Sequence, residues 1–214
     1  MRIVLALAAA ALLAVPAPAA QEARIETSMG TIVVALDADK APATVANFVR
    51  YAREGHYNGT LFYRIVPGFV IQAGSWGADH KWRPPHQPIP LETATGLSNL
   101  RGTIAMGRED KPASATTEFF INLDDNNARG LDPKPGDAPN STGYAVFGHV
   151  SAGMDVVDAI AAVPVGGGKG PFPANEPVTP VVIRKVTIAT VADAPSAPPP
   201  APAGQSAPAT PPAQ

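Results

Sequence analysis

The chain has 214 residues, a formal net charge of −2 and no cysteine. The absence of cysteine excludes a disulfide framework, a thiol nucleophile and a cysteine-ligated metal. Neither half carries a basic block, which argues against nucleic acid as the main partner. The 25 prolines and 19 glycines, against only 16% charged and 6% aromatic residues, indicate many turns and short strands.

The first 20 residues have the pattern of a secretory signal peptide. Arg2 supplies a positive charge, residues 3–15 form an apolar run, and the sequence APA at 17–19 matches the A-x-A cleavage pattern. The run is short for crossing a bilayer. We therefore expect residues 1–20 to be removed, which leaves a periplasmic or secreted protein with no stable membrane insertion. The alternative is an uncleaved membrane anchor.

Residues 193–214 form a Pro/Ala-rich tail. After Asp193 this tail holds no charge and no large apolar residue. It cannot bury enough apolar surface to offset the entropy of ordering, so we expect it to be disordered. One domain remains, over residues 23–192. A tail that recruits a partner is a further alternative.

The predicted elements begin with a β-hairpin. Two β-rich runs, residues 24–27 and 31–36, flank a turn that contains Gly30. A helix follows, with Pro42 near its start, apolar residues at helical spacing, and Gly55 as its C-terminal cap.

Short β-rich runs make up most of the remaining domain. A second helix is expected at 154–163, where a proline and a glycine cluster stop it, and a last strand at 181–190. The strands expected between the two helices are 61–66, 69–72, 102–106, 118–123 and 144–150. Many strands with only two helices predict a mainly-β fold, with an antiparallel sheet closed into a barrel and capped by helices.

Four segments of the domain carry a resemblance to a known family. They are FYRIVPGFVIQAG at 62–74, RGTIAMGR at 101–108, SATTEFFIN at 114–122 and GYAVFGHV at 143–150. In this order and spacing they resemble the cyclophilins, and the cysteine-free form with its GTIAM run resembles the bacterial members. The resemblance covers essentially the whole domain.

The resemblance implies a closed eight-stranded antiparallel β-barrel capped by two α-helices, with the substrate groove on its outer surface. It also implies a peptidyl-prolyl cis/trans isomerase that acts on proline-containing polypeptides, as a monomer and without a cofactor or metal. The residues that match the family's catalytic positions are Arg64, Phe69, Gln72 and Phe120. Those that match its substrate-binding positions are Val70, Met106, Gly107, Arg108, Leu131 and Tyr144.

These residue types suit the reaction. An X-Pro bond isomerises over tens to hundreds of seconds because amide resonance raises a barrier of roughly 18–20 kcal/mol. Arg64 would donate a hydrogen bond to the proline nitrogen as it becomes pyramidal, which stabilises the twisted amide. The apolar side chains would hold the proline ring, and Gln72 would bind the peptide carbonyl and steady Arg64. The backbone at Gly107 and Arg108 would pair with the extended peptide.

Each assignment has a structural alternative. Taken alone, Arg64 is typical of a solvated charge on a strand, and Phe69 and Phe120 are typical of a barrel core. The family resemblance favours the groove for all three. The phenylalanines expected in the core are Phe62, Phe119 and Phe147.

The sequence departs from the family pattern at several groove positions. Val70 stands in place of the methionine of many relatives, Gly107 in place of an alanine and Glu118 in place of a glutamine. The first two change the size of the pocket, whereas Glu118 adds a charge that would shift substrate preference. The aromatic residue that relatives place just before the pair Leu131-Asp132 is missing. Because that residue helps eukaryotic relatives to bind cyclosporin, we expect weak cyclosporin binding here.

Two functions stay open from the sequence. The first is an isomerase that accelerates X-Pro isomerisation while exported proteins fold. The second is a non-catalytic peptide-binding module or chaperone that keeps the groove but has lost turnover. The presence of all four residues at the catalytic positions favours the first.

Overall fold

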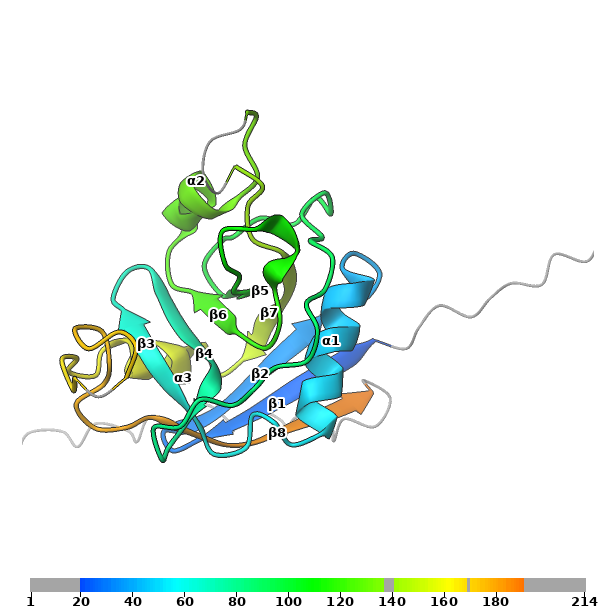
Figure 1. Ribbon diagram of the computed structural model, residues 1–214. Coiled ribbons are helices and arrows are strands. Elements are labelled where there is room, and N and C mark those ends of the chain that lie inside the picture. Colours follow the sequence, from blue (N-terminus) through cyan, green and yellow to red (C-terminus); the bar gives the residue numbers. More distant parts are fainter. Residues whose placement is uncertain (1–19, 137–140, 169, 191–214) are drawn as a thin grey trace, which may run out of the picture.

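Eight antiparallel strands close into a barrel in the computed structural model, which describes residues 20–136, 141–168 and 170–190 (Figure 1). The strands are β1 (Gln21–Thr27), β2 (Gly30–Leu36), β3 (Thr60–Val66), β4 (Val70–Gly77), β5 (Thr103–Met106), β6 (Phe119–Asn122), β7 (Val146–Ala152) and β8 (Val182–Thr190). Their order around the barrel is β1-β2-β7-β5-β6-β4-β3-β8, and the pairing of β8 with β1 closes it. This architecture confirms the predicted fold class.

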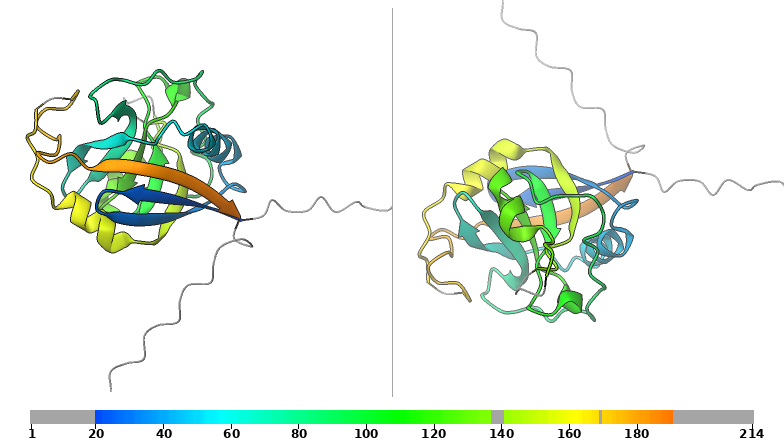
Figure 2. Two further views of the ribbon diagram at one scale, coloured as in Figure 1. Left: turned by 90° about the horizontal axis from the view of Figure 1, so that it is seen from below. Right: turned by 90° about the horizontal axis from the view of Figure 1, so that it is seen from above.

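Helices cover the barrel on two sides (Figure 2). α1 (Pro42–Arg53) and α3 (Met154–Ala161) lie on opposite sides of it. Gly55, in the left-handed region at φ +71°, follows the end of α1 as predicted. A short third helix, α2 (Ala128–Leu131), follows a 3₁₀ turn at Asp125–Asn127 and adds to the two helices that the sequence predicts.

Several predicted strand boundaries differ from those of the structure by a few residues, and one of these differences concerns a predicted site residue. The sequence predicts Phe69 at the start of a strand, whereas it lies in the turn between β3 and β4, where its N–H donates to the Val66 carbonyl at 2.9 Å. Gly68 provides the left-handed conformation of this turn, at φ +72°. The Phe69 carbonyl accepts hydrogen bonds from the Leu123 N–H (2.8 Å) and from Asn127 Nδ2 (2.6 Å). These bonds fix Phe69 beside the end of β6.

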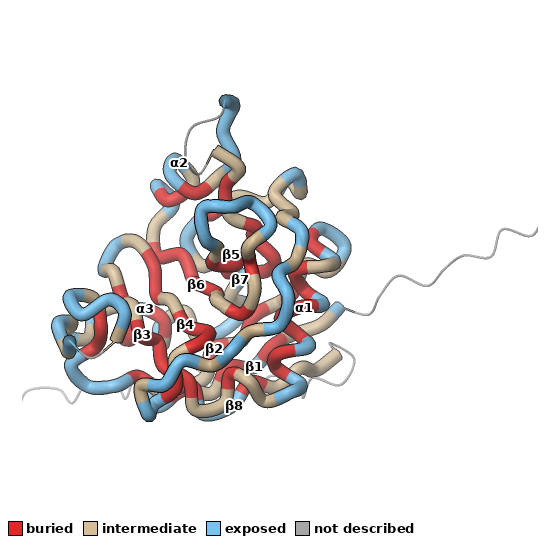
Figure 3. The backbone as a smooth tube through the Cα atoms, viewed as in Figure 1, coloured by how far each residue is buried: buried red, intermediate tan, exposed pale blue. Residues whose placement is uncertain are grey.

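Large aromatic side chains fill the interior of the barrel, and buried residues follow the strands and α1 (Figure 3). Neighbouring rings of this core have their centres 5.2 to 6.3 Å apart. Its members, all without exposed surface, are Phe48, Tyr57, Phe62, Phe119 and Phe147. The interior positions predicted for three phenylalanines are thereby confirmed. Because these rings occupy the lumen, a ligand site has to lie on the outside of the barrel.

The predicted signal peptide, apart from Ala20, and the predicted tail lie outside the described residues. Within the described part of the chain, no helix is long and apolar enough to cross a membrane.

Candidate functional site

A second apolar cluster lies on the outer face of the barrel, apart from the interior core. Side chains alternate between the two faces of a strand, so on β6 Phe119 packs in the core and Phe120 in this outer cluster. On β4 the same alternation sends Ile71 inward and Val70 outward. The outer cluster consists of Val70, Ala105, Phe120, Leu131 and Val146, with Phe69, Leu97 and Tyr144 packed against it.

Met106 does not belong to this outer face. On β5, Ala105 packs in the outer cluster, whereas the Met106 side chain is 1% exposed and packs in the interior core. Successive residues of a strand face opposite sides, so only one of the two can reach the outer face. The structure therefore places the Met106 side chain in the core and away from the pocket, although the sequence predicts that it binds substrate.

A register shift in β3 brings Arg64 to the outer face beside Gln72. Phe62 pairs with Ala73 and Arg64 pairs with Gln72, so the shift falls between Phe62 and Arg64 and includes Tyr63. Such a bulge sets two residues of one strand opposite a single residue of its partner. Arg64 Nη1 consequently donates a hydrogen bond to Gln72 Oε1 at 3.0 Å.

A pocket of about 260 Å³ opens over the outer cluster. Every predicted site residue except Met106 lines it, and Phe172 joins them. The lining residues are Arg64, Phe69, Val70, Gln72, Gly107, Arg108, Phe120, Leu131, Tyr144 and Phe172. An apolar wall with a few converging polar groups is the usual composition of a ligand site.

The Arg64 guanidinium lies between two aromatic rings. Its central carbon is 5.9 Å from the ring centre of Phe69 and 5.2 Å from that of Phe172. Its Nε is buried and has no hydrogen-bond partner among the described residues. A buried donor without a partner costs free energy until something accepts its hydrogen bond. Nε itself is out of a ligand's reach, but Arg64 is partly exposed and lines the pocket, and the only hydrogen bond of its guanidinium to a described residue is the one from Nη1 to Gln72. The remaining Nη–H groups are therefore the donors available to a bound ligand.

Arg108 and Tyr144 line the pocket from the other side of the outer face. The Arg108 guanidinium donates to the Gly143 carbonyl (2.8 Å) and lies 4.7 Å from the Tyr144 ring centre. The Tyr144 ring meets Phe120 edge-on, with centres 5.7 Å apart. The Gly107 N–H already donates to the Glu118 carbonyl at 2.8 Å. The pairing predicted with an extended peptide would therefore use the other backbone groups of Gly107 and Arg108.

A hydrogen-bonded chain runs from Arg64 through Gln72 to the half-buried carboxyl group of Glu118. Gln72 Nε2 donates to the Tyr63 hydroxyl at 2.8 Å and to Glu118 Oε2 at 3.3 Å. Tyr63 donates to Glu118 Oε2 at 2.6 Å, and Ser75 donates to Glu118 Oε1. Burial raises the pKa of Glu118, and the hydrogen bonds from Ser75, Tyr63 and Gln72 offset this only in part. Burial, followed by the Glu118 charge, also raises the pKa of Tyr63, which keeps this hydroxyl protonated at neutral pH.

Replacing Glu118 with glutamine is expected to stabilise the protein at neutral pH and to remove part of its pH dependence. The folded-state pKa of Glu118 lies above the ordinary value of 4.5, so the wild type loses free energy of unfolding as the pH rises through that folded-state pKa. Glutamine does not titrate and keeps the three contacts, because its oxygen can accept from Tyr63 and Gln72 while its nitrogen donates to Ser75.

Urea denaturation of both proteins, below pH 4.5 and at neutral pH, checks this expectation. The advantage of Glu118→Gln should be small at the acidic pH and grow toward neutral pH. Equal pH dependence in the two proteins would show that Glu118 titrates at its ordinary pKa.

A second hollow, of about 500 Å³, continues the pocket along the barrel. It shares Gln72, Gly107 and Arg108 with the pocket and extends to Trp82 and His86. Because they share these three residues, the two hollows form one continuous groove on the outside of the barrel.

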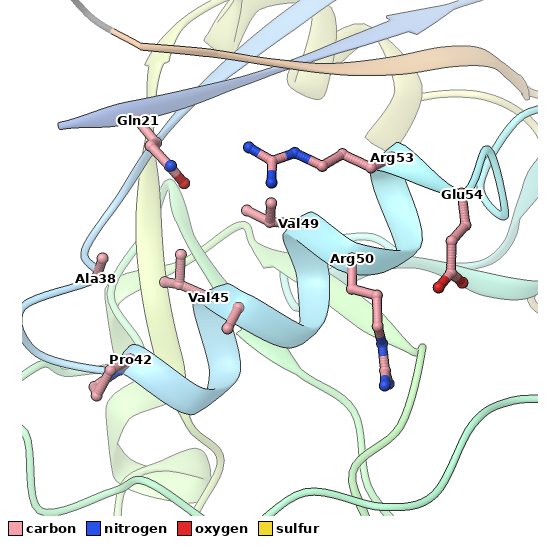
Figure 4. Close-up of a pocket in the computed structure, with 9 residues that line it drawn as sticks. Gln21, Ala38, Pro42, Val45, Val49, Arg50, Arg53 and Glu54 are labelled. Carbon is pink, nitrogen blue, oxygen red and sulfur yellow. The ribbon is translucent and has the colours of Figure 1, made fainter. Parts of the chain in front are cut away.

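A larger hollow lies elsewhere, along α1 (Figure 4). It measures about 600 Å³, and Val45, Val49 and Pro42 give it an apolar wall. Of its charged groups, Arg50 donates to Asn47 Oδ1 (3.1 Å) and Glu54 pairs with His86 (2.7 Å), whereas Arg53 is exposed to solvent. None of the predicted site residues lines this hollow, so the smaller Arg64 pocket, which they line, is the better candidate for the functional site.

Tyr63 and Phe172 are site residues that the sequence reasoning missed. Tyr63 stands next to Arg64 in the segment 62–74, but only the register shift in β3 shows that it faces the carboxyl group of Glu118. Phe172 lies in a loop, and its only signal in the sequence is an aromatic residue between two prolines.

Comparisons with known proteins point to one family. Residues 23–188 match the family model "Cyclophilin type peptidyl-prolyl cis-trans isomerase/CLD". The chain is 44% identical over 164 residues to "Peptidyl-prolyl cis-trans isomerase cyp18" of Streptomyces antibioticus, an alignment that covers 77% of this chain and 96% of that protein. It is 43% identical over 162 residues to "Peptidyl-prolyl cis-trans isomerase B" of Escherichia coli, covering 76% of this chain and 96% of the relative.

A solved structure supports the fold alone. The cyclophilin-type isomerase of Cryptosporidium parvum superposes with a TM-score of 0.62 at 21% identity, covering 79% of this chain and 98% of that one. A second crystal structure of that protein, in the presence of the dipeptide Ala-Pro, superposes with a TM-score of 0.61 at 21% identity, covering 78% of this chain and 98% of that one.

Proposed function

Because the chain belongs to the cyclophilin family and is a peptidyl-prolyl cis/trans isomerase, we propose that it accelerates X-Pro isomerisation in exported proteins while they fold. The observation that carries this proposal is the N-terminal segment, with its positive charge, apolar run and APA sequence. β1 begins at Gln21, so removal of residues 1–20 leaves every strand and the whole pocket intact.

In the proposed mechanism no bond is made or broken. The outer cluster holds the proline ring, with Phe120 and Phe69 as its largest surfaces. Arg64 donates to the proline nitrogen as the amide twists and its lone pair is freed from resonance. Gln72 accepts from Arg64 at 3.0 Å and thereby fixes the guanidinium before the substrate arrives. The rate gain comes from binding the twisted amide more tightly than either planar form.

Expression of the full chain in a bacterium tests the cellular part of the proposal. We expect a mature protein that begins at Ala20 or Gln21 and is released with the periplasmic contents, as shown by N-terminal sequencing of the fractions. Changing both Ala17 and Ala19 to leucine serves as the matched control, because it removes the small residues that the cleavage site needs. A wild-type chain that stays uncleaved in the membrane fraction would contradict export and support the anchor alternative.

The mature protein should also accelerate the slow, proline-limited refolding phase of an exported protein, which takes seconds to minutes without a catalyst. An unchanged refolding rate, despite turnover of short peptides, would contradict the folding role while leaving the isomerase activity intact.

Two further expectations about partners stay predictions. The first is that the protein acts as a monomer. The second is that it binds cyclosporin weakly. Gly130 stands where relatives place an aromatic residue before Leu131, and a Cβ atom built there would meet nothing within 4 Å. Weak binding follows because this side of the pocket offers no ring for an apolar ligand.

A further inference from the structure

Phe172 is an exposed aromatic residue that borders the pocket from a distant part of the chain. It lies in the loop between α3 and β8, and its side chain is 41% exposed. Its ring stacks on that of Tyr63, with centres 6.0 Å apart and planes at 16°, and faces the Arg64 guanidinium at 5.2 Å. Leaving a large aromatic side chain partly in water costs free energy. A bound group that covers the exposed part of this ring would recover that free energy.

The loop that carries Phe172 is tied to the barrel. The Ile65 N–H of β3 donates to the Asn175 carbonyl at 2.8 Å, and the Asn175 N–H donates back to the Phe172 carbonyl at 2.9 Å. The buried carboxyl group of Glu176 accepts the Gly170 N–H. Hydrogen bonds therefore brace the loop on both sides of the ring. A braced ring binds at a lower entropic cost than one on a free loop.

Phe172 stands at one edge of the groove. Around the barrel, β5, β6 and β4 lie between β7, which Tyr144 precedes, and β3, which carries Arg64. Tyr144 and Arg108 therefore bound the pocket at the β7 edge, and Phe172 bounds it at the β3 edge. A peptide whose proline rests on Phe120, between these edges, would place a flanking residue against Phe172.

We propose that Phe172 contacts the substrate directly and selects for a large apolar or aromatic residue beside the proline, on the β3 side of the groove. This proposal rests on the proposed function, in which Phe120 and Arg64 hold the prolyl bond. The ring supplies an apolar face to such a side chain, with a further gain for an aromatic pair. The Arg64 charge next to it disfavours lysine or arginine at the same position.

The experiment compares two series of reporter peptides, one varied before the proline and one after it, with phenylalanine, leucine, glycine and lysine at the varied position. Both kcat/KM and the peptide Kd are measured for the wild type, Phe172→Ala and Phe172→Leu. Val178→Ala is the matched control, because Val178 is an exposed apolar residue of the same loop that does not line the pocket.

In one of the two series, Phe172→Ala should weaken the phenylalanine and leucine peptides by about three- to tenfold while changing the glycine peptide by less than about twofold. Phe172→Leu should keep most of the preference for leucine and lose that for phenylalanine. Val178→Ala should match the wild type throughout.

An equal fall for every peptide would overturn the proposal, because Phe172 would then act only by positioning Arg64. Unchanged ratios in both series would overturn it as well. A wild type that binds the peptides without turning them over would instead refute the proposed function, so the two failures are distinguishable.

Discussion

Replacing Arg64 with alanine is expected to lower kcat/KM for an X-Pro reporter peptide by about 10²-fold, the loss typical of one preorganised charge-stabilising donor. Arg64 is held before any substrate arrives, by Gln72 at 3.0 Å and by the flanking rings of Phe69 and Phe172. Arg64 is only partly buried and lines the pocket, so its removal opens no cavity in the core and should cost little stability. Activity should therefore fall far more than stability, as measured by the cis-to-trans rate and by thermal unfolding.

Arg64→Lys is the informative control for this variant. Lysine keeps the charge but loses the planar fork, so it cannot both donate to Gln72 and present a second donor in a fixed direction. We expect kcat/KM of Arg64→Lys to exceed that of Arg64→Ala by less than about tenfold. Full activity of Arg64→Ala would support the alternative that Arg64 is only a solvated charge on a strand. A wild type that binds the peptide without accelerating its isomerisation would favour the non-catalytic binding module.

The division between core and groove could be predicted from the sequence only in part. Strand periodicity separates Phe119 from Phe120 once the strand is known, and the family resemblance gives the side that faces out. The same periodicity places Met106 in the core, whereas its position in a segment that resembles the family predicts a groove residue. A strand segment that resembles the family always includes residues of both faces, so the resemblance alone does not say which of them line the groove.

The features that the sequence could not predict depend on long-range pairing. Nothing local in residues 62–74 indicates the shift that sets Arg64 opposite Gln72, because a bulge is defined by the partner strand. Phe172 reaches Arg64 only because the Asn175 carbonyl accepts from the backbone of β3. The closing strand β8 follows this loop and pairs with β3, so the contact exists only in the closed barrel.

The adjacent residues Phe119 and Phe120 are expected to respond in opposite ways to replacement by alanine. Phe119 has no exposed surface, and its ring meets those of Phe48, Tyr57 and Phe62 edge-on at 5.3 to 6.3 Å. Its removal leaves a cavity in the middle of the core, which costs about 3–5 kcal/mol of the free energy of unfolding. Urea denaturation measures this loss, and Phe119→Leu provides a milder variant should the alanine variant not fold.

Phe120 is 5% exposed, but one side of its ring borders the pocket, so fewer protein atoms surround it than surround Phe119. Phe120→Ala should therefore lose less stability than Phe119→Ala, while kcat/KM per folded molecule falls by at least about tenfold because the proline ring loses its largest contact. Phe119→Leu should retain turnover per folded molecule. If Phe120→Ala were as unstable as Phe119→Ala and kept its turnover, Phe120 would be a core residue and the outer cluster would not hold proline. Loss of stability at Phe119 together with loss of turnover at Phe120 is expected only if one face of β6 packs in the core and the other face binds the substrate.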